Sequence, residues 1–190
     1  MNKFFHQIKK FWNFLKKDTW QSWIVSLVLA FVLIKFILFP FLSWTFATPL
    51  PLVVVESCSM YHQDDFDSWW SRNGPWYESR GISMEDFRAY TLKNGLNKGD
   101  IVLVSGRGDY EQGDVLIFNS QYRYPLIHRL VRLEPYDTKG DNNFAQLLGE
   151  TDIQPSQFVG RAVARVPGLG WIKLIFFEGS KPKEQRGFCK

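Results

Sequence analysis

The stretch WIVSLVLAFVLIKFILFPFLSW, from Trp23 to Trp44, decides how this chain is organised. It holds one charged residue, Lys35, and as a helix rising about 1.5 Å per residue it would cross the ~30 Å hydrocarbon core of a bilayer. Tryptophans near both ends suit the two membrane interfaces, and Pro40 is tolerated near a helix end. We therefore predict a transmembrane helix over residues 22–44 and a membrane-anchored protein.

The basic residues are concentrated ahead of this helix. Five of the 23 Lys and Arg residues and one of the 19 Asp and Glu residues lie in residues 1–21, which leaves 18 of each sign in the rest. The net charge of +4 therefore belongs to this tail, and nucleic acid is not an expected partner. Because positive charge stays inside, we expect a single-pass protein of the cell membrane, with a cytoplasmic N-terminus and the chain from Thr45 on the outer face. Cleavage near TFATPL (Thr45–Leu50), as in a secretory signal, is the alternative.

The tail itself mixes lysines with large apolar side chains. This pattern is typical of an amphipathic helix lying on anionic lipid, which makes membrane lipid an expected partner. The alternative is that the lysines only set the topology of a frayed tail. The apolar residues are Phe4, Phe5, Ile8, Phe11, Trp12, Phe14 and Leu15.

Short apolar runs, separated by Gly-, Asp- and Asn-rich breaks, follow the anchor. Their length and β-branched content favour strands, and no βαβ rhythm is present. We predict a small, mainly β, antiparallel domain over residues 45–178 and a C-terminal tail over residues 179–190. The expected strands lie near residues 50–57, 100–105, 114–120, 124–133, 158–166 and 171–177.

Residues 62–95 interrupt this pattern with a partly helical insertion. In SMEDFRAYTLKNG, Ser83 can cap a short helix, with Asp86 at the capping-box position and Gly95 near its end. The preceding SWWSRNGPWY is rich in aromatic residues. Its expected role is a local core that holds the insertion together. An aromatic platform at the membrane or beside a substrate groove is the alternative.

The first apolar run of the domain ends in a cluster of reactive side chains, VVVESCSMYH (Val53–His62). A serine is a poor nucleophile until a neighbouring base accepts its proton. Of the three histidines, His6 lies on the predicted cytoplasmic side, and His62 is too close in sequence to face Ser59 squarely. The remaining candidate base is His128.

The chain has two cysteines, Cys58 and Cys189. They are too few to indicate a disulfide framework or a redox compartment. Cys58, His62 and His128 carry side chains that bind zinc, but they lack the spacing of zinc sites. No metal is therefore predicted.

Three motifs occur in order behind the anchor: ESCSMYH, LIHRLVRL (Leu126–Leu133) and TKGDNN (Thr138–Asn143). Together they resemble the type I signal peptidases of the Ser–His branch, found in archaea, in some bacteria and in the endoplasmic reticulum. That branch carries an S-x-S-M motif, a strand reading roughly I-x-H-R and a T-K-G-D-N motif. The better-known bacterial enzymes use a lysine base at the place of His128. The likeness extends from the anchor to about Trp171, and the insertion interrupts it.

The resemblance implies a signal-peptidase-like catalytic domain and assigns roles to four residues. Ser59 would be the nucleophile, and His128 would be the general base and then the general acid for the leaving amine. Asp141, in KGDNN, would orient His128 or support the site. The Ser57 hydroxyl and the Ser59 backbone N–H would bind the oxyanion.

The chain departs from the family pattern beside the nucleophile. The family usually has glycine or another small residue between the two serines and a proline soon after the methionine. Here those places hold Cys58 and His62. A thiol next to Ser59 makes oxidation sensitivity conceivable, and the missing proline suits the start of an insertion.

A second departure concerns the acid that would act with His128. Family members tend to carry a further acid after the aspartate of G-D-N, and this chain has Leu147 at that place. Glu150 and Asp152, in GETD, are the nearby substitutes. We predict Asp141 as the relay acid, with Asp152 as the alternative.

The function that the resemblance implies is a membrane-bound serine endopeptidase that removes signal peptides from exported precursors. Its partners would be precursor proteins bearing signal peptides, with the export translocon as a further candidate, and it would need no metal or organic cofactor. A processing peptidase with narrower clients is one alternative. A non-catalytic, degenerate relative that binds exported chains is the alternative from another class.

Overall fold

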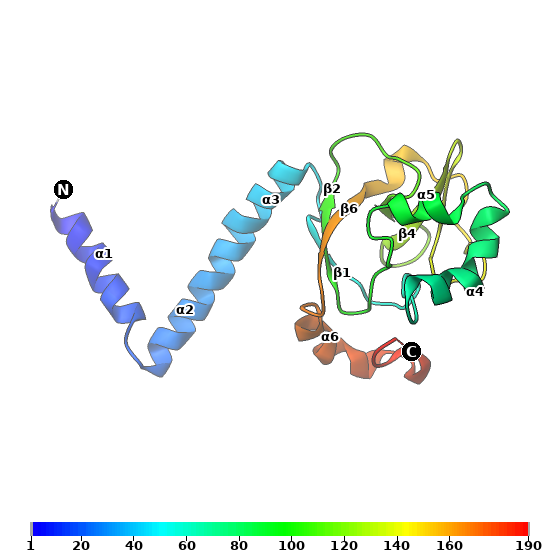
Figure 1. The fold of residues 1–190 in the computed structure, drawn as a ribbon. Coiled ribbons are helices and arrows are strands. Elements are labelled where there is room, and N and C mark those ends of the chain that lie inside the picture. Colours follow the sequence, from blue (N-terminus) through cyan, green and yellow to red (C-terminus); the bar gives the residue numbers. More distant parts are fainter. Residues whose placement is uncertain (1, 190) are drawn as a thin grey trace. The chain divides into compact units, whose positions relative to one another are not determined.

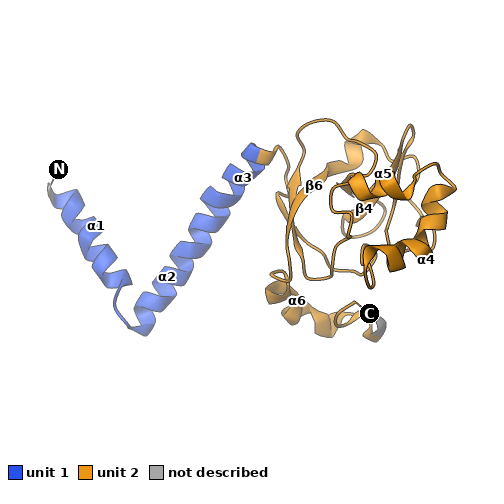
Figure 2. Cartoon of the chain, viewed as in Figure 1, with its two compact units in different colours: residues 1–45 blue, residues 46–190 orange. Residues whose placement is uncertain are grey.

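The computed structural model of the chain describes residues 2–189, so Met1 and Lys190, the outer ends of the two predicted tails, lie outside the described residues. The chain divides into two compact units, residues 1–45 and 46–190 (Figure 2). The first unit is helical, and the second contains the sheet and the remaining helices.

The first unit starts with an amphipathic helix and continues into a long apolar one. Thr19 caps the start of α2, where its hydroxyl accepts a hydrogen bond from the Ser22 backbone N–H. A π-helical turn lies directly before Pro40, and there the Phe39 N–H bonds to the Ile34 carbonyl five residues back. Because proline has no N–H, a shift of helical register beside it costs little. The elements are α1 (Asn2–Leu15), α2 (Trp20–Leu33), η1 (Ile34–Leu38) and α3 (Phe39–Phe46).

Helices α2 to α3 form one run of 27 residues, Trp20–Phe46, that is long and apolar enough to cross a membrane. At about 1.5 Å per residue it spans roughly 40 Å. The apolar side chains of this run are exposed to a large extent, as those of Trp23, Leu27 and Phe31 illustrate. The predicted single N-terminal apolar helix is therefore present, with a length sufficient for a bilayer.

The second unit is built on one antiparallel sheet of six strands in the order β1-β2-β6-β3-β4-β5. Figure 1 labels four of them, β1, β2, β6 and β4. The predicted antiparallel arrangement is confirmed, since every strand pair runs in opposite directions. The strands are β1 (Leu52–Val54), β2 (Ile101–Ser105), β3 (Val115–Phe118), β4 (Leu126–Leu133), β5 (Tyr136–Lys139) and β6 (Phe158–Val166).

Apolar side chains cover both faces of the central strands. On β3, Val115 and Ile117 point into one buried cluster, whereas Leu116 and Phe118 point into another. This follows from the alternation of side chains along a strand. Strand β3 is therefore buried on both faces, which explains why its sequence is an uninterrupted apolar run.

The insertion carries two helices, α4 (Phe66–Glu78) and α5 (Met84–Ala89), that pack through a third buried cluster. The predicted capping box is confirmed, because the Ser83 and Asp86 side chains each bond the other's backbone N–H. The predicted local aromatic core is also present, with Trp69 and Tyr77 fully buried.

One secondary-structure expectation is wrong, and one strand was not predicted. Residues 171–177 form a helix, α6 (Trp171–Phe177), instead of the predicted strand. Leu174 of α6 is buried, while Ile175 and Phe176 are exposed, a one-sided pattern that suits a surface helix. Strand β5 was not predicted, because its residues, YDTK, lack an apolar run. The remaining helical turns are η2 (Pro155–Gln157), η3 (Glu178–Ser180) and η4 (Lys183–Gln185).

Candidate active site

Ser59 and His128, which lie 69 residues apart, meet at the end of β1 and the start of β4. The distance from His128 Nε2 to Ser59 Oγ is 2.9 Å, which suits proton transfer between a serine and its base. His128 is 1% exposed, whereas Ser59 is partly exposed. Ser59 Oγ is therefore accessible to a bound molecule, while the His128 ring is shielded from water.

The second ring nitrogen of His128 faces Glu150. The distance from Nδ1 to Glu150 Oε1 is 2.5 Å, although the angle of approach departs from that of a good hydrogen bond. The carboxylate favours the tautomer with its proton on Nδ1, which leaves the Nε2 lone pair facing Ser59. Glu150 is itself fully buried, and its other oxygen accepts a hydrogen bond from the Leu147 N–H.

Asp141 binds other partners and makes no hydrogen bond with His128. Its carboxylate accepts hydrogen bonds from Arg129 Nη2 at 2.7 Å and from Tyr77 Oη at 2.9 Å, and it lies 2.8 Å from His62 Nε2. Burial alone would raise the pKa of Asp141, but the Arg129 guanidinium and the His62 hydrogen bond outweigh it and hold that pKa well below its ordinary value.

The strand geometry explains this division of acids. His128 and Arg129 are consecutive on β4, so their side chains point to opposite faces of the sheet. Arg129 pairs with Asp141 on one face, and His128 meets Glu150 on the other. The predicted pairing of Asp141 with His128 is therefore not observed.

The alternative relay acid, Asp152, is also away from His128. It is exposed, its N–H donates to Asp137 Oδ1 at 2.9 Å, and one of its carboxylate oxygens accepts from Gln154 Nε2 at 3.2 Å. The structure thus brings together Ser59 and His128 as predicted, but it supplies Glu150 as the neighbouring acid. The sequence signal was present in GETD, where Glu150 stands two residues before Asp152.

Ser57 lies beside Ser59. Its Oγ is 3.1 Å from Ser59 Oγ, and the residue is exposed. A hydroxyl at this distance can donate a hydrogen bond to an oxyanion that forms beside the nucleophile.

The TKGDNN loop supports the backbone at Cys58 and Ser59. The Asn142 N–H donates to the Ser59 carbonyl at 2.8 Å, and the Asn142 side chain donates to the Cys58 carbonyl at 3.1 Å. Gly140 allows this close approach, because a Cβ there would lie 2.9 Å from both Ser59 O and His128 Nε2. The glycine of the motif is thus required by its close packing against Ser59 and His128.

His62 fastens the insertion to this loop. Its ring stacks on Trp69 with 3.7 Å between centroids, and its Nε2 contacts Asp141. Burial lowers the pKa of His62 below its ordinary value, although the Asp141 hydrogen bond acts in the opposite direction. His62 was not expected to act as the base for Ser59, and its observed contacts are with Asp141 and Trp69.

Cys58, between the two serines, forms a disulfide bond with Cys189, with 5.6 Å between their Cα atoms. Two cysteines 131 residues apart gave no indication of pairing in the sequence. The bond joins the C-terminal end of the described chain to the S-C-S motif.

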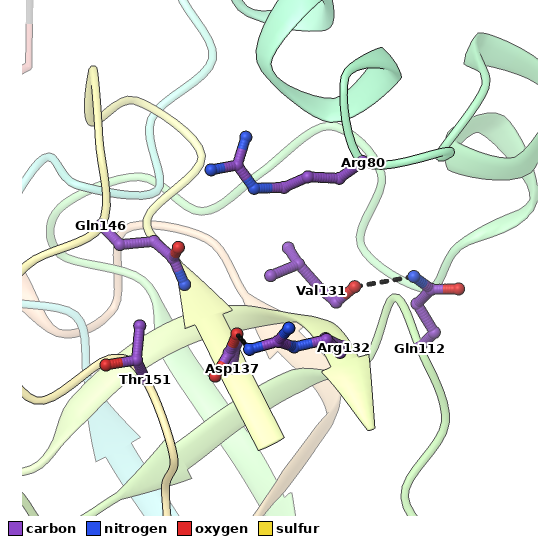
Figure 3. A pocket seen from close by; sticks show the side chains of 7 residues that line it. All are labelled: Arg80, Gln112, Val131, Arg132, Asp137, Gln146 and Thr151. Carbon is purple, nitrogen blue, oxygen red and sulfur yellow. Dashed lines mark hydrogen bonds and ion pairs between the residues drawn. The ribbon is translucent and has the colours of Figure 1, made fainter. Parts of the chain in front are cut away.

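A pocket of about 450 Å³ is lined mainly by polar and charged residues (Figure 3). Its wall includes Gln146 and Thr151, which lie on either side of Glu150 in the sequence. Figure 3 shows Arg80 and Arg132 on opposite sides of it. Neither Ser59 nor His128 lines this pocket. Its charged wall does not suit small apolar side chains. We therefore do not expect this pocket to bind the small apolar side chains of a substrate held at Ser59.

No protein-family model matches the chain, and no curated protein matches its sequence.

Proposed function

We propose that this protein is a membrane-anchored serine endopeptidase that cleaves signal peptides from exported precursors. The observation that carries the proposal is the chain of contacts from Ser59 through His128 to Glu150. A nucleophile, a base within hydrogen-bond distance and a buried acid behind the base form the arrangement that activates a serine.

In the proposed mechanism, Ser59 Oγ attacks the scissile carbonyl while His128 Nε2 takes its proton. The resulting oxyanion accepts hydrogen bonds from the Ser57 hydroxyl and the Ser59 N–H. His128 then protonates the leaving amine, which leaves an ester on Ser59. Water, deprotonated by His128, attacks this ester, releases the carboxylic acid product and restores the Ser59 hydroxyl. Glu150 stabilises the imidazolium in both steps.

The edge position of β1 supports an extended peptide substrate. Among the described strands, β1 pairs with β2 alone, and it leads within a few residues to Ser57 and Ser59. An exposed strand edge can hold a peptide by main-chain hydrogen bonds. The preference for small side chains near the scissile bond is an expectation that comes from the family resemblance.

The apolar run Trp20–Phe46 supports a membrane anchor, and the lysines ahead of it support a cytoplasmic N-terminus. Only 12 residues separate Phe46 from Ser59, so the segment that joins the apolar run to Ser59 is short. The Cys58–Cys189 disulfide is consistent with an outer-face location, because disulfides persist in oxidising compartments.

Helix α1 supports contact with lipid on the cytoplasmic side. Its apolar residues Phe4, Phe5 and Trp12 are more than half exposed, and lysines lie between them. An amphipathic helix of this composition fits an anionic membrane surface.

The proposal is tested with the detergent-solubilised full chain and a purified secretory precursor. We expect the wild type to cut at one site after the apolar region of the signal. Ser59→Ala and His128→Ala should abolish cleavage. Ser71→Ala, at an exposed serine of α4, is the matched control and should cleave normally.

Full cleavage by Ser59→Ala would overturn the proposal. If the wild type leaves intact a precursor that a known signal peptidase cleaves, the alternative is a non-catalytic domain that binds exported chains. Co-purification of precursors or translocon components from native membranes would then test that alternative.

A further inference from the structure

The C-terminal strap, defined here as residues 178–189, is fastened to the segment that carries the nucleophile. Its covalent link is the Cys58–Cys189 disulfide. A second link is made by Lys181. Its Nζ donates a hydrogen bond to the Glu56 carbonyl at 3.1 Å and forms an ion pair with the Glu56 carboxylate at 3.7 Å. The strap thus holds Glu56 and Cys58, the two residues on either side of Ser57.

Lys98 anchors the strap itself. Its side chain is 1% exposed, and its Nζ donates three hydrogen bonds, to Glu178 Oε2 at 2.8 Å, to the Gln185 carbonyl at 2.7 Å and to the Gly187 carbonyl at 3.0 Å. The Gly187 N–H bonds to the same Glu178 oxygen. A buried ammonium that uses all three donors on one segment fixes that segment firmly.

The contacts of the nucleophile come from two sides. The TKGDNN loop holds the Ser59 carbonyl through Asn142, and the strap holds the Cys58 side chain. The Ser59 hydroxyl must stay within hydrogen-bond distance of His128 while Ser57 faces the oxyanion. A displacement near 1 Å at such a site costs about 100-fold in rate.

We propose that Cys189 and the strap are positioning elements for the reaction: through the disulfide they hold Cys58, and with it Ser57 and Ser59, in the reactive arrangement. A consequence is that a dithiol reductant slows the chemical step. Reduction transfers two electrons and two protons from the dithiol, breaks the S–S bond, leaves thiols on Cys58 and Cys189 and converts the reductant to a disulfide. This inference rests on the proposed function, because it assigns the strap to that same site.

The test uses the full chain in detergent, before and after treatment with dithiothreitol. Because the chain has only these two cysteines, the reagent acts on no other disulfide within it. We expect kcat for precursor cleavage to fall about 10- to 100-fold with KM little changed. The Cys58→Ser/Cys189→Ser double variant should show the same low kcat without reductant and should not respond to it.

A readout independent of activity is amide hydrogen exchange. Reduction should speed exchange of the segment around Asn142, whose N–H binds Ser59, while β2 and β3 stay protected. Faster exchange throughout the domain would assign the disulfide a merely structural role and overturn the inference. An unchanged kcat, or a rise in KM alone, would overturn it as well.

Failure of the two proposals is distinguishable. If Ser59→Ala cleaves like the wild type, the proposed function fails, whatever dithiothreitol does. If Ser59→Ala is inactive while reduction changes neither kcat nor exchange near Asn142, only the positioning role fails. If the chain cleaves no precursor, exchange near Asn142 still decides whether the disulfide holds the nucleophile segment.

Discussion

The carboxylate of Glu150 lies 2.5 Å from the imidazole of His128, and neither side chain is more than 2% exposed. In such a buried place, the charge of an acid acts strongly on the ring beside it. Glu150 is therefore the acid of the proposed catalytic machinery. Asp141, which pairs with Arg129, instead stabilises the fold.

Glu150→Gln should lower kcat/KM by about 100- to 10,000-fold, because the imidazolium then loses its counter-charge and its preferred tautomer. Glutamine keeps the shape of the side chain and an oxygen for the Leu147 N–H. Steady-state kinetics on a precursor measures the effect. Asp152→Asn is the matched control: its left-handed backbone, with φ of 53°, suits asparagine, and we expect less than about a threefold change. A larger loss in Asp152→Asn than in Glu150→Gln would reverse the assignment.

Asp141→Asn should destabilise the domain by about 3 to 5 kcal/mol, because Arg129 is then left as a buried charge without its counter-ion. Denaturant unfolding in detergent measures this change. Asp67→Asn removes the exposed ion pair with Arg88 and should cost less than about 1 kcal/mol.

The same residue sets an acid limit for stability. The folded chain lowers the pKa of Asp141 below its ordinary 3.8, so its ion pair stabilises the fold above that pH and is lost as the pH falls below it. Stability of the wild type should therefore drop below about pH 4, and Asp141→Asn should show a shallower drop. Equal slopes for the two proteins would contradict this account.

Gly140→Ala should reduce kcat/KM by about 10- to 100-fold, because its Cβ would lie 2.9 Å from His128 Nε2 and from the Ser59 carbonyl, and 2.6 Å from Asn143 Nδ2. Cleavage kinetics, with thermal unfolding alongside, checks it. Gly179→Ala is the control, because nothing lies within 4 Å of a Cβ at that position. Similar activity of the two variants would show that the loop can move away without loss.

Lys139→Met should change how stability depends on pH. Burial lowers the pKa of Lys139 to about 8, partly offset by Asp141 and Glu150, so the unfolded chain holds more protons than the folded one between pH 8 and 10.5. Through this group, stability of the wild type should rise by about 2 kcal/mol from pH 8 to pH 10, and the variant should lack that rise. The exposed Lys93→Met is the control and should behave like the wild type. A rise that persists in Lys139→Met would place its origin elsewhere.

Periodicity and motif order predicted the apolar helix, the antiparallel sheet and the meeting of Ser59 with His128. These features follow from local patterns, such as apolar runs of strand length and the capping box at Ser83. The prediction of a strand at residues 171–177 is wrong, because a short apolar run alone does not distinguish a strand from a surface helix with one apolar face.

The acid beside His128 depends on tertiary structure. Asp141 matches the motif, but it forms an ion pair with Arg129, whose side chain lies on the face of β4 opposite to His128. Glu150 reaches the site because its carbonyl accepts the Thr138 N–H, which places it beside β5. Strand β5 itself lacks an apolar pattern, so the sequence shows Glu150 as one nearby acid but not that it is the acid that faces His128.

The disulfide also has a consequence for the order of biosynthesis. Cys189 follows Cys58 by 131 residues, which at ribosomal speeds of about 5 to 20 residues per second corresponds to roughly 7 to 26 s. During that interval the nascent chain contains Ser59 but not the cysteine that fastens its neighbour. Newly made molecules therefore pass through an immature period, and the S-C-S motif reaches its final covalent state only after translation has passed Cys189.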